Sequence, residues 1–489
     1  MKDKFRYIPK EERKTILLLS DDLRVHSGIG TMAREIVINT AHHFNWLNLG
    51  AAVKHVEEGK FLDLSEDVNN HAGITDADVK VIPSTGYGDA MKVRELIRMF
   101  KPDALMLFTD PRYWVWLFEI EREIRSKIPI FYYNIWDDYP SPLYNKSYYD
   151  SVDLLMAISK QTKNINELVL DERADDKIIS YVPHGINSER FHPINEDSSE
   201  YSDFLRFKKE IFKESEQDNK EIEYVVFFNS RNIRRKSPGD VVLAYRIFCD
   251  KIGKEKAKKC ALLMHTSPVD QNGTDLFALK EAICDPEYVN VYFSSGKLDT
   301  QQMNILYNLA DVNILISSNE GWGLSLTEAM MSGTMIIPNV TGGMQDQCRF
   351  EDEEGNWINF SSDFPSNHLG RYKKCGEWAR PVFPSNRSLV GSVPTPYIFD
   401  DRCNPEDVAD AIMDVYNLGP EERKRRGLKG REWVMSEESG MSAVNMGNNV
   451  IKYCDQAFEE FIPRPTFEVH KVTDRPRKYV KHTLYGYGS

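Results

Sequence analysis

ILISSNEGWGLSLTEAMMSGTMIIPNVTGG, residues 314–343, is the stretch that decides the expected fold. An apolar run typical of a buried strand ends in a polar loop, a helical pattern follows over 324–331, and a second apolar run covers 335–337. A parallel crossover needs a helix to carry the chain back to the start of the next strand. This order of elements therefore predicts a parallel α/β domain.

The same alternation extends on both sides of this stretch. Expected strands cover 15–20, 79–83, 103–108, 128–134 and 153–159, and then 224–228, 261–264, 289–293, 312–316 and 335–337. Expected helices cover 29–38, 90–100, 116–126, 238–251, 301–309, 324–331, 407–416, 420–434 and 441–461. Because a polar, acidic stretch at 195–204 separates the two runs, we predict an α/β protein with two Rossmann-like parallel-sheet domains that face a cleft.

We place the N-terminal domain at 1–200 and the C-terminal domain at 201–440, followed by a helix and tail at 441–489 that packs back on the N-terminal domain. From 345 to 401 the pattern breaks into Gly, Pro, Ser, Asn and aromatic residues. An irregular stretch of this length is unusual inside a compact domain. We expect a functional lid or an added lobe there, with disorder as the alternative.

Composition and charge exclude several classes of protein. The 489 residues are 41% hydrophobic and 28% charged, which excludes collagen-like, low-complexity and wholly disordered chains. The balance of 62 basic and 75 acidic residues gives a net charge of −13, which argues against tight non-specific nucleic-acid binding by the chain as a whole. Seven cysteines form no C-x-x-C pair, and no segment has the length and apolarity of a secretory signal or membrane span. We therefore expect a cytoplasmic protein without a membrane span.

Two carboxylates, Glu320 and Glu328, are separated by seven residues at the strand-to-helix junction. Gly321 and Gly323 allow close approach of the backbone to a ligand, and the free N–H groups at a helix start favour a phosphate. Glu328, one turn into the helix, can accept hydrogen bonds from paired hydroxyls such as those of a ribose, and Glu320 is placed for a second polyol. An ordinary turn with solvated glutamates accounts less well for this combination.

A basic loop follows the strand expected at 224–228. The segment FFNSRNIRRKSPG, residues 227–239, places Arg231 and, five residues later, Lys236 at the end of this strand. Two cations there need an anion, and they could bracket a diphosphate in place of a metal ion. The alternative is a solvated basic turn, and we expect part of the run, Arg234 and Arg235, to be only that.

A glycine loop, His26-Ser27-Gly28-Ile29-Gly30, precedes the first expected helix. It lacks the third glycine of the dinucleotide fingerprint and the lysine of a P-loop, so NAD binding and ATP hydrolysis are poorly supported. We interpret it as a glycine turn whose backbone reaches an anion or a sugar.

Together these motifs resemble the retaining glycosyltransferases of the two-domain GT-B architecture, in the group-4 (glycosyl transferases group 1) family. Four motifs match in order: the turn Gly28-Ile29-Gly30, the segment VPHGINSERFHP at 182–193, the spacing of Arg231 and Lys236, and the E-x7-E signature that ends at Glu328. The resemblance covers most of residues 15–345 and 404–435.

The resemblance implies a retaining, metal-independent enzyme that moves a sugar from a nucleotide-diphosphate sugar to a hydroxyl acceptor bound by the N-terminal domain. Arg231 and Lys236 would hold the donor diphosphate, Glu328 the ribose and Glu320 the donor sugar. No cofactor or metal is implied. The other implied donor-binding residues are Gly28, Gly30, Gly321, Trp322, Gly323, Leu324 and Lys297, the last within the loop 294–298 beside the nucleobase.

The sequence departs from the family at one position. Many members carry a histidine after the strand expected at 128–134, whereas this chain continues Ile135-Trp136-Asp137-Asp138. We take Asp137 as the substitute catalytic residue, with Asp110 as the second choice. Either aspartate could instead be a capping carboxylate of a loop.

Three features leave the acceptor and the activity open. Asp76-Ala77-Asp78 spells a metal-binding D-x-D, but a turn is the expected use before a strand. A basic tail, 470–489, keeps a transferase acting on hydroxylated bases of DNA as an alternative to a glycan, lipid or small-molecule acceptor. The missing histidine keeps a non-catalytic nucleotide-sugar-binding protein open, and an epimerase or phosphorylase of the same architecture is the other rival. The sequence does not indicate an oligomeric state.

Overall fold

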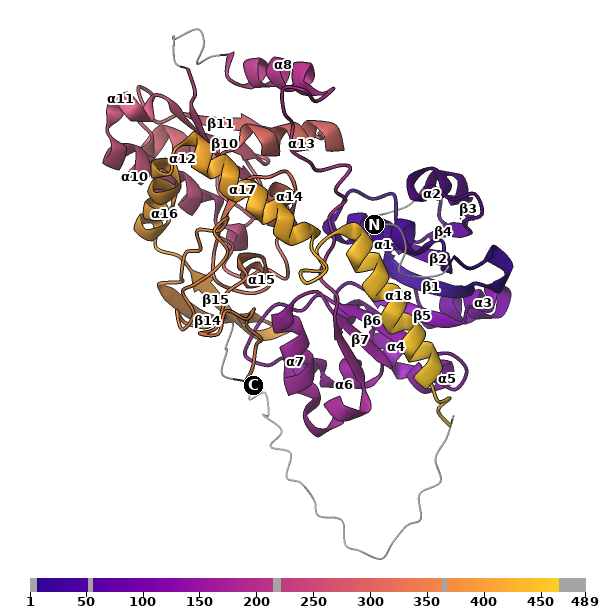
Figure 1. The fold of residues 1–489 in the computed structure, drawn as a ribbon. Coiled ribbons are helices and arrows are strands. Elements are labelled where there is room, and N and C mark those ends of the chain that lie inside the picture. The colour runs from indigo at the N-terminus through magenta and orange to yellow at the C-terminus, as the bar shows by residue number, and fades with distance from the viewer. Residues whose placement is uncertain (1–6, 52–55, 214–220, 363–366, 466–489) are drawn as a thin grey trace, which may run out of the picture.

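The structure is a computed structural model that describes residues 7–51, 56–213, 221–362 and 367–465 (Figure 1). The described residues form two sheets with helices around them and a separate hairpin. Within each sheet the pairing is parallel, apart from one edge strand in the first. The expected α/β class with two parallel sheets is confirmed.

The first sheet has eight strands in the order β3-β4-β2-β1-β5-β6-β7-β8, and β3 is the antiparallel edge strand. Its central strands are buried on both faces, as is usual where helices cover both sides of a parallel sheet. The strands are β1 (Lys14–Asp21), β2 (Phe44–Ala51), β3 (Leu62–Asp63), β4 (Val79–Pro83), β5 (Ala104–Phe108), β6 (Ile130–Asn134), β7 (Leu154–Ala157) and β8 (Ile178–Tyr181). The helices are α1 (Gly28–Thr40), α2 (Ser65–Ala72), α3 (Ala90–Phe100), α4 (Val115–Glu119), α5 (Glu121–Arg125), α6 (Lys146–Asp150) and α7 (Lys160–Leu170).

The second sheet has five parallel strands in the order β11-β10-β9-β12-β13. They are β9 (Tyr224–Asn229), β10 (Cys260–His265), β11 (Val291–Ser294), β12 (Val312–Leu315) and β13 (Met335–Pro338). The helices are α8 (Tyr201–Ile211), α10 (Pro238–Ile252), α11 (Lys254–Ala257), α12 (Leu276–Ile283), α13 (Thr300–Leu309), α14 (Leu324–Met331), α15 (Met344–Cys348), α16 (Pro405–Asn417) and α17 (Pro420–Met435).

The last helix, α18 (Ala443–Glu460), leaves the second domain and lies along α1 of the first (Figure 1). The chain crosses between the domains at 182–194 and again near 441. These crossings are hydrogen-bonded to each other, because Ile186 N donates to Met441 O (2.9 Å) and Ala443 N donates to Ile186 O (3.0 Å). Gly447 lets α18 approach closely, since a Cβ there would lie 2.7 Å from the Cβ of Asn39.

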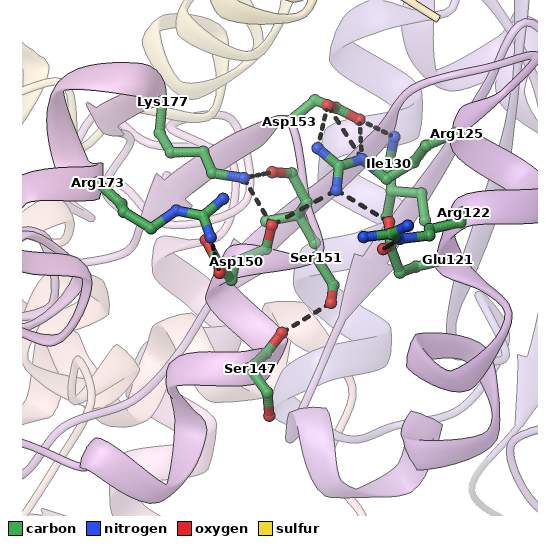
Figure 2. Close-up of polar contacts among 11 residues, drawn as sticks. Glu121, Arg122, Arg125, Ile130, Ser147, Asp150, Ser151, Asp153, Arg173 and Lys177 are labelled. Atoms are coloured by element: carbon green, nitrogen blue, oxygen red, sulfur yellow. Dashed lines mark hydrogen bonds and ion pairs between the residues drawn. The ribbon is translucent and has the colours of Figure 1, made fainter. Parts of the chain in front are cut away.

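A buried polar cluster fixes the amino ends of β6, β7 and β8 (Figure 2). Arg125, whose side chain is 1% exposed, donates to Asp153 (2.6 Å) and to Glu121 (2.9 Å). Lys177 Nζ donates to the carbonyls of Asp150 (2.7 Å) and Val152 (2.6 Å). Buried charges are tolerated when they are paired in this way, and the carboxyl ends of the same strands are left for the loops that face the second domain.

The structure differs from the sequence prediction in several elements. Among the elements that were not expected are the strands β2 and β8 and the helices α2, α7 and α12. The helix expected at 116–126 is two short helices that meet at Ile120. The segment 345–401 is not simply irregular. It contains most of α15 and an antiparallel hairpin, β14 (Asn386–Ser392) and β15 (Thr395–Arg402), which extends toward the first domain.

Candidate active site

A cavity of about 1010 Å³ lies between the domains, at the carboxyl ends of both sheets. Its walls are the loops after β1, β5 and β6 on one side and the loops after β9, β11 and β12 on the other. This is the position where parallel α/β sheets bind ligands. The lining includes these sequence-predicted residues: Gly28, Asp110, Asp137, Arg231, Lys236, Lys297, Glu320, Gly321, Trp322, Gly323, Leu324 and Glu328. Gly30 is not among the lining residues, and its N–H donates to Ser27 Oγ (2.9 Å), the side chain that caps α1.

An ion cluster of buried Lys236 and Glu320 with the more exposed Arg235 occupies the second-domain side of the cavity. Lys236 Nζ donates to Glu320 Oε2, and Arg235 Nη1 donates to the same oxygen (3.2 Å). Burial alone would raise the pKa of Glu320, but the charges of Lys236 and Arg235 lower it to about 2. Burial lowers the pKa of Lys236, against the pull of Glu320. Glu320 is therefore ionised at neutral pH.

Two loops that are far apart in sequence are joined beneath this cluster. Ser318 N donates to Arg235 O (2.8 Å), and Arg235 Nη1 donates to Asn319 O (2.9 Å). From the other side Gly343 N donates to Glu320 O (3.0 Å), and a Cβ on Gly343 would lie 2.0 Å from the carbonyl oxygen of Gly321. The backbone on both sides of Glu320 is thus held by neighbouring segments.

The turn before α14 directs the start of this helix at the cavity. Gly323 has φ 85°, a left-handed conformation that favours glycine, and it is the cap residue from which the helix begins at Leu324. Trp322 is buried beside it, and its Nε1 donates to Thr327 Oγ1 (3.0 Å). The start of this eight-residue helix and the side chains of Lys236 and Arg235 therefore line the same part of the cavity.

Glu328 belongs to a hydrogen-bonded chain that the sequence did not reveal. Asn229 Nδ2 donates to Tyr307 Oη (2.7 Å), which in turn donates to Glu328 Oε2. Burial raises the pKa of Glu328, and the hydrogen bond from Tyr307 opposes this effect. Tyr307 lies in α13, outside every motif, so only its place in the fold connects it to the site.

Arg231 and Arg235 lie in the same basic loop, but the structure places their side chains differently, and the loop sequence does not predict this difference. The Arg231 side chain is 66% exposed at the cavity rim, and its Nε donates to Asp270 (3.1 Å). Arg235, expected to be part of a solvated turn, instead contacts Glu320, whereas Arg234 is exposed. This corrects the interpretation of the loop, because its 3-10 turn at Arg234–Lys236 orients Arg235 and Lys236 toward Glu320.

Asp137 faces the ion cluster from the first domain. It is half-buried, and burial raises its pKa to about 6, with Arg235 lowering it and Glu320 adding to the rise. The domains touch here, since a Cβ on Gly321 would lie 3.0 Å from Ile135 O and 3.8 Å from Asp137 Cβ. Asp110, the second choice, is paired with Arg112 (2.8 Å) and caps the turn at Pro111–Trp114.

Asp76 and Asp78 lie outside the cavity lining and are engaged in ion pairs. Asp76 pairs with Arg13 (2.7 Å) and Asp78 with Lys10 (3.6 Å). Within 7–51, 56–213, 221–362 and 367–465, no group of three His, Cys, Asp or Glu side chains could hold a metal ion. The basic tail lies outside the described residues. None of the helices that the structure describes combines the length and the apolar character needed to cross a membrane.

Comparison with known proteins gives one family and many similar structures. Residues 208–363 match the family described as "Glycosyl transferases group 1". No curated protein matches the chain by sequence. HepE from Anabaena, solved in complex with UDP and glucose, is 11% identical with a TM-score of 0.58, over 91% of this chain and all of that one. A glycosyltransferase from Rickettsia africae is 15% identical with a TM-score of 0.58, over 92% of this chain and 100% of that chain.

A third similar structure, sucrose-phosphate synthase from Thermosynechococcus elongatus, is 14% identical with a TM-score of 0.58, over 91% of this chain and 100% of that chain. At these identities the likeness shows a shared two-domain fold. It supports the GT-B architecture expected from the sequence.

Proposed function

We propose that this chain, whose residues 208–363 match the group 1 glycosyl transferases, transfers a sugar from a nucleotide-diphosphate sugar to a hydroxyl acceptor, with retention of configuration and without a metal ion. The observation that carries the proposal is that Lys236 and Arg235, which contact Glu320, line the same cavity between the domains as the start of α14.

The proposed roles follow from the charge that develops during transfer. The bond between the anomeric carbon and the phosphate oxygen breaks, and its electron pair leaves with the nucleoside diphosphate. The acceptor oxygen bonds to that carbon, and its proton passes to a basic oxygen in the site. Fixed positive charge and N–H dipoles stabilise the leaving diphosphate, which is what Lys236, Arg235 and the α14 start supply. Arg231 reaches the diphosphate once it leaves Asp270.

The remaining residues are assigned by their places in the cavity. Glu328, oriented by Tyr307, binds the ribose hydroxyls, and Glu320 holds the donor sugar. Lys297 lies at the nucleobase end. Asp137 faces Glu320 from the acceptor side, where a carboxylate with a pKa of about 6 is basic enough to bind an acceptor hydroxyl near neutral pH.

The donor is best sought among uridine diphosphate sugars, because HepE, which shares the fold, is solved with UDP and with UDP-glucose. Purified protein is incubated with UDP-, GDP- and ADP-sugars, and release of the nucleotide is measured with and without an extract that supplies hydroxyl acceptors. Release that rises with the extract supports transfer. Donor binding without release in any mixture contradicts it and favours a binding protein.

The finer parts of the proposal have separate tests. Nuclear magnetic resonance of the product distinguishes retention from inversion at the anomeric carbon. Activity that survives EDTA supports a metal-independent reaction, and strong dependence on Mg²⁺ or Mn²⁺ contradicts it. Mass spectrometry of glycans, lipids and DNA after reaction identifies the acceptor. An epimerase would change the sugar without needing an acceptor.

A further inference from the structure

The strand β15 (Thr395–Arg402) contacts the first domain through residues 395–399. Its residues 400 and 401 contact the loop that contains Glu320, residues 316–323, called the Glu320 loop below. Arg112 donates to Thr395 Oγ1, Tyr397 Oη donates to Ser141 O (3.2 Å), and Phe399 N donates to Tyr139 O (2.8 Å). The first-domain partners, Arg112, Ser141 and Tyr139, lie in the loops after β5 and β6. Thr395 and Ile398 themselves line the cavity.

The next residue, Asp400, binds the segment that leads into Glu320. Its Oδ1 accepts hydrogen bonds from Ser318 Oγ and from Asn319 Nδ2, each 2.9 Å long. Asp401 N then donates to Ser318 O (2.9 Å). One carboxylate oxygen thus holds both side chains that precede Glu320.

Asp401 anchors this end of the strand to the second domain. Its buried carboxylate accepts hydrogen bonds from Arg387 (2.7 Å), Thr341 (2.8 Å) and Asn367 (2.8 Å), and its carbonyl accepts from Asn339 Nδ2 (2.8 Å). Since this residue is fully buried and multiply bonded, replacing it would disturb the fold. Asp400 is only half-buried, so its contacts can be removed with the anchor left in place.

We propose that Asp400 is a positioning residue for Glu320, which holds the donor sugar. In this proposal β15 fixes the position of the Glu320 carboxylate relative to the first domain, which binds the acceptor. The inference rests on the proposed function. A change of loop position moves the Glu320 carboxylate with respect to Lys236 and Arg235, which hold the leaving group. The nucleoside end is independent of Asp400, because Glu328 is oriented by Tyr307.

The test compares wild type with Asp400→Ala, Asp400→Asn and the control Ser388→Ala. Ser388 pairs with Asp400 across the hairpin, but its Oγ bonds Asn386 on its own strand (3.1 Å). UDP affinity is measured by calorimetry, kcat and KM with the UDP-sugar that the wild type turns over, and amide hydrogen exchange over residues 316–323.

For Asp400→Ala we expect UDP affinity within threefold of wild type, kcat reduced at least tenfold and faster exchange over 316–323. Asp400→Asn keeps an acceptor oxygen and should stay within threefold in kcat, and Ser388→Ala should match wild type. If Asp400→Ala leaves both kcat and exchange unchanged, the proposal is wrong. It is also wrong if UDP affinity and kcat fall together with thermal stability, because that is the pattern of general loosening.

The failure of the proposed function would look different. In that case wild type turns over no nucleotide sugar, and the exchange comparison between wild type, Asp400→Ala and Asp400→Asn still decides whether Asp400 orders the Glu320 loop.

Discussion

Lys236 and Glu320 form an ion pair at the wall of the interdomain cavity, where their side chains are only 11% and 12% exposed. A buried pair contributes little net stability, but an unpaired buried charge costs several kcal/mol. The pair is therefore better explained by its place next to the helix start than by folding. One single variant and one double variant can separate these roles.

Lys236→Met should destabilise the protein by about 3 kcal/mol, because Glu320 loses its closest cation and keeps the longer contact with Arg235. The double variant Lys236→Met/Glu320→Gln should recover most of this loss while remaining inactive. Urea unfolding measures the free energy of unfolding, and nucleotide release measures activity. Equal stability of the single and double variants would contradict the assigned pairing.

Arg235→Ala should lower nucleotide release by about a hundredfold, corresponding to about 3 kcal/mol of lost transition-state stabilisation. Arg231→Ala should mainly weaken UDP binding, because this side chain lies at the exposed rim. Arg234→Ala, in an exposed position of the same loop, is the matched control and should leave both properties unchanged. Calorimetry with UDP and steady-state kinetics distinguish the three variants. A larger kinetic defect in Arg234→Ala than in Arg235→Ala would contradict the role assigned to Arg235.

Tyr307→Phe removes the hydroxyl that binds Glu328 and should reduce UDP affinity about fivefold, the value of about 1 kcal/mol for one hydrogen bond. The wild type should bind 2′-deoxy-UDP more weakly than UDP, and this difference should shrink in Tyr307→Phe. Calorimetry with both nucleotides provides the measurement. A wild type that binds both nucleotides equally would remove the ribose assignment from Glu328.

Asp137→Asn should raise thermal stability at pH 8 and abolish most activity. The folded-state pKa of Asp137, about 6, is raised above the ordinary value near 4, so its favourable contribution is complete below pH 4 and is lost as the pH rises through 6. The stability advantage of the asparagine variant should therefore grow between pH 5 and pH 8. In wild type, activity should fall as the pH drops below 6. Thermal scans and pH–rate profiles test both; an advantage that shrinks with rising pH contradicts the assignment.

Gly321→Ala should impair catalysis with little effect on UDP binding. The added methyl group would lie 3.0 Å from Ile135 O and 3.1 Å from Ile158 Cδ1, so the two domains could no longer approach as closely. Small-angle scattering with UDP present should show a more open molecule than wild type. Unchanged kcat together with an unchanged scattering profile would show that this approach is not needed.

The sequence predicted the elements whose patterns are local. The strand at 79–83 and the helix at 90–100 have the predicted bounds, because each is a compact apolar or amphipathic run with clear flanking residues. The strand β2 was missed because asparagines interrupt its apolar run. Asn48 is nevertheless fully buried, with Nδ2 bonded to Leu18 O (3.2 Å) and Ser20 Oγ (3.1 Å). A polar residue satisfied by neighbouring strands leaves no sign in local hydropathy.

In the candidate site, too, residues with a local spacing pattern could be predicted, and residues brought together by the fold could not. The cations, glycines and glutamates near the cavity were found because their spacing is local, within 231–236 and 320–328. Which arginine contacts Glu320 depends on the turn at Arg234–Lys236 and on Ser318, which lies over eighty residues away in sequence. Tyr307 and Asp400 act through hydrogen bonds between distant segments. Such residues have no spacing signal, so only the fold could reveal them.

The path of the last helix has a consequence for how the protein is made and dissected. Because α18 packs on α1 while following the second domain in sequence, the second domain is in effect an insertion within the first. During synthesis the first domain completes its core only after residues 443–460 have left the ribosome. A fragment that ends at residue 200 would expose the apolar surface that α18 covers. Linking α18 directly to the start of the first domain, as in a circular permutant, would cover that surface again.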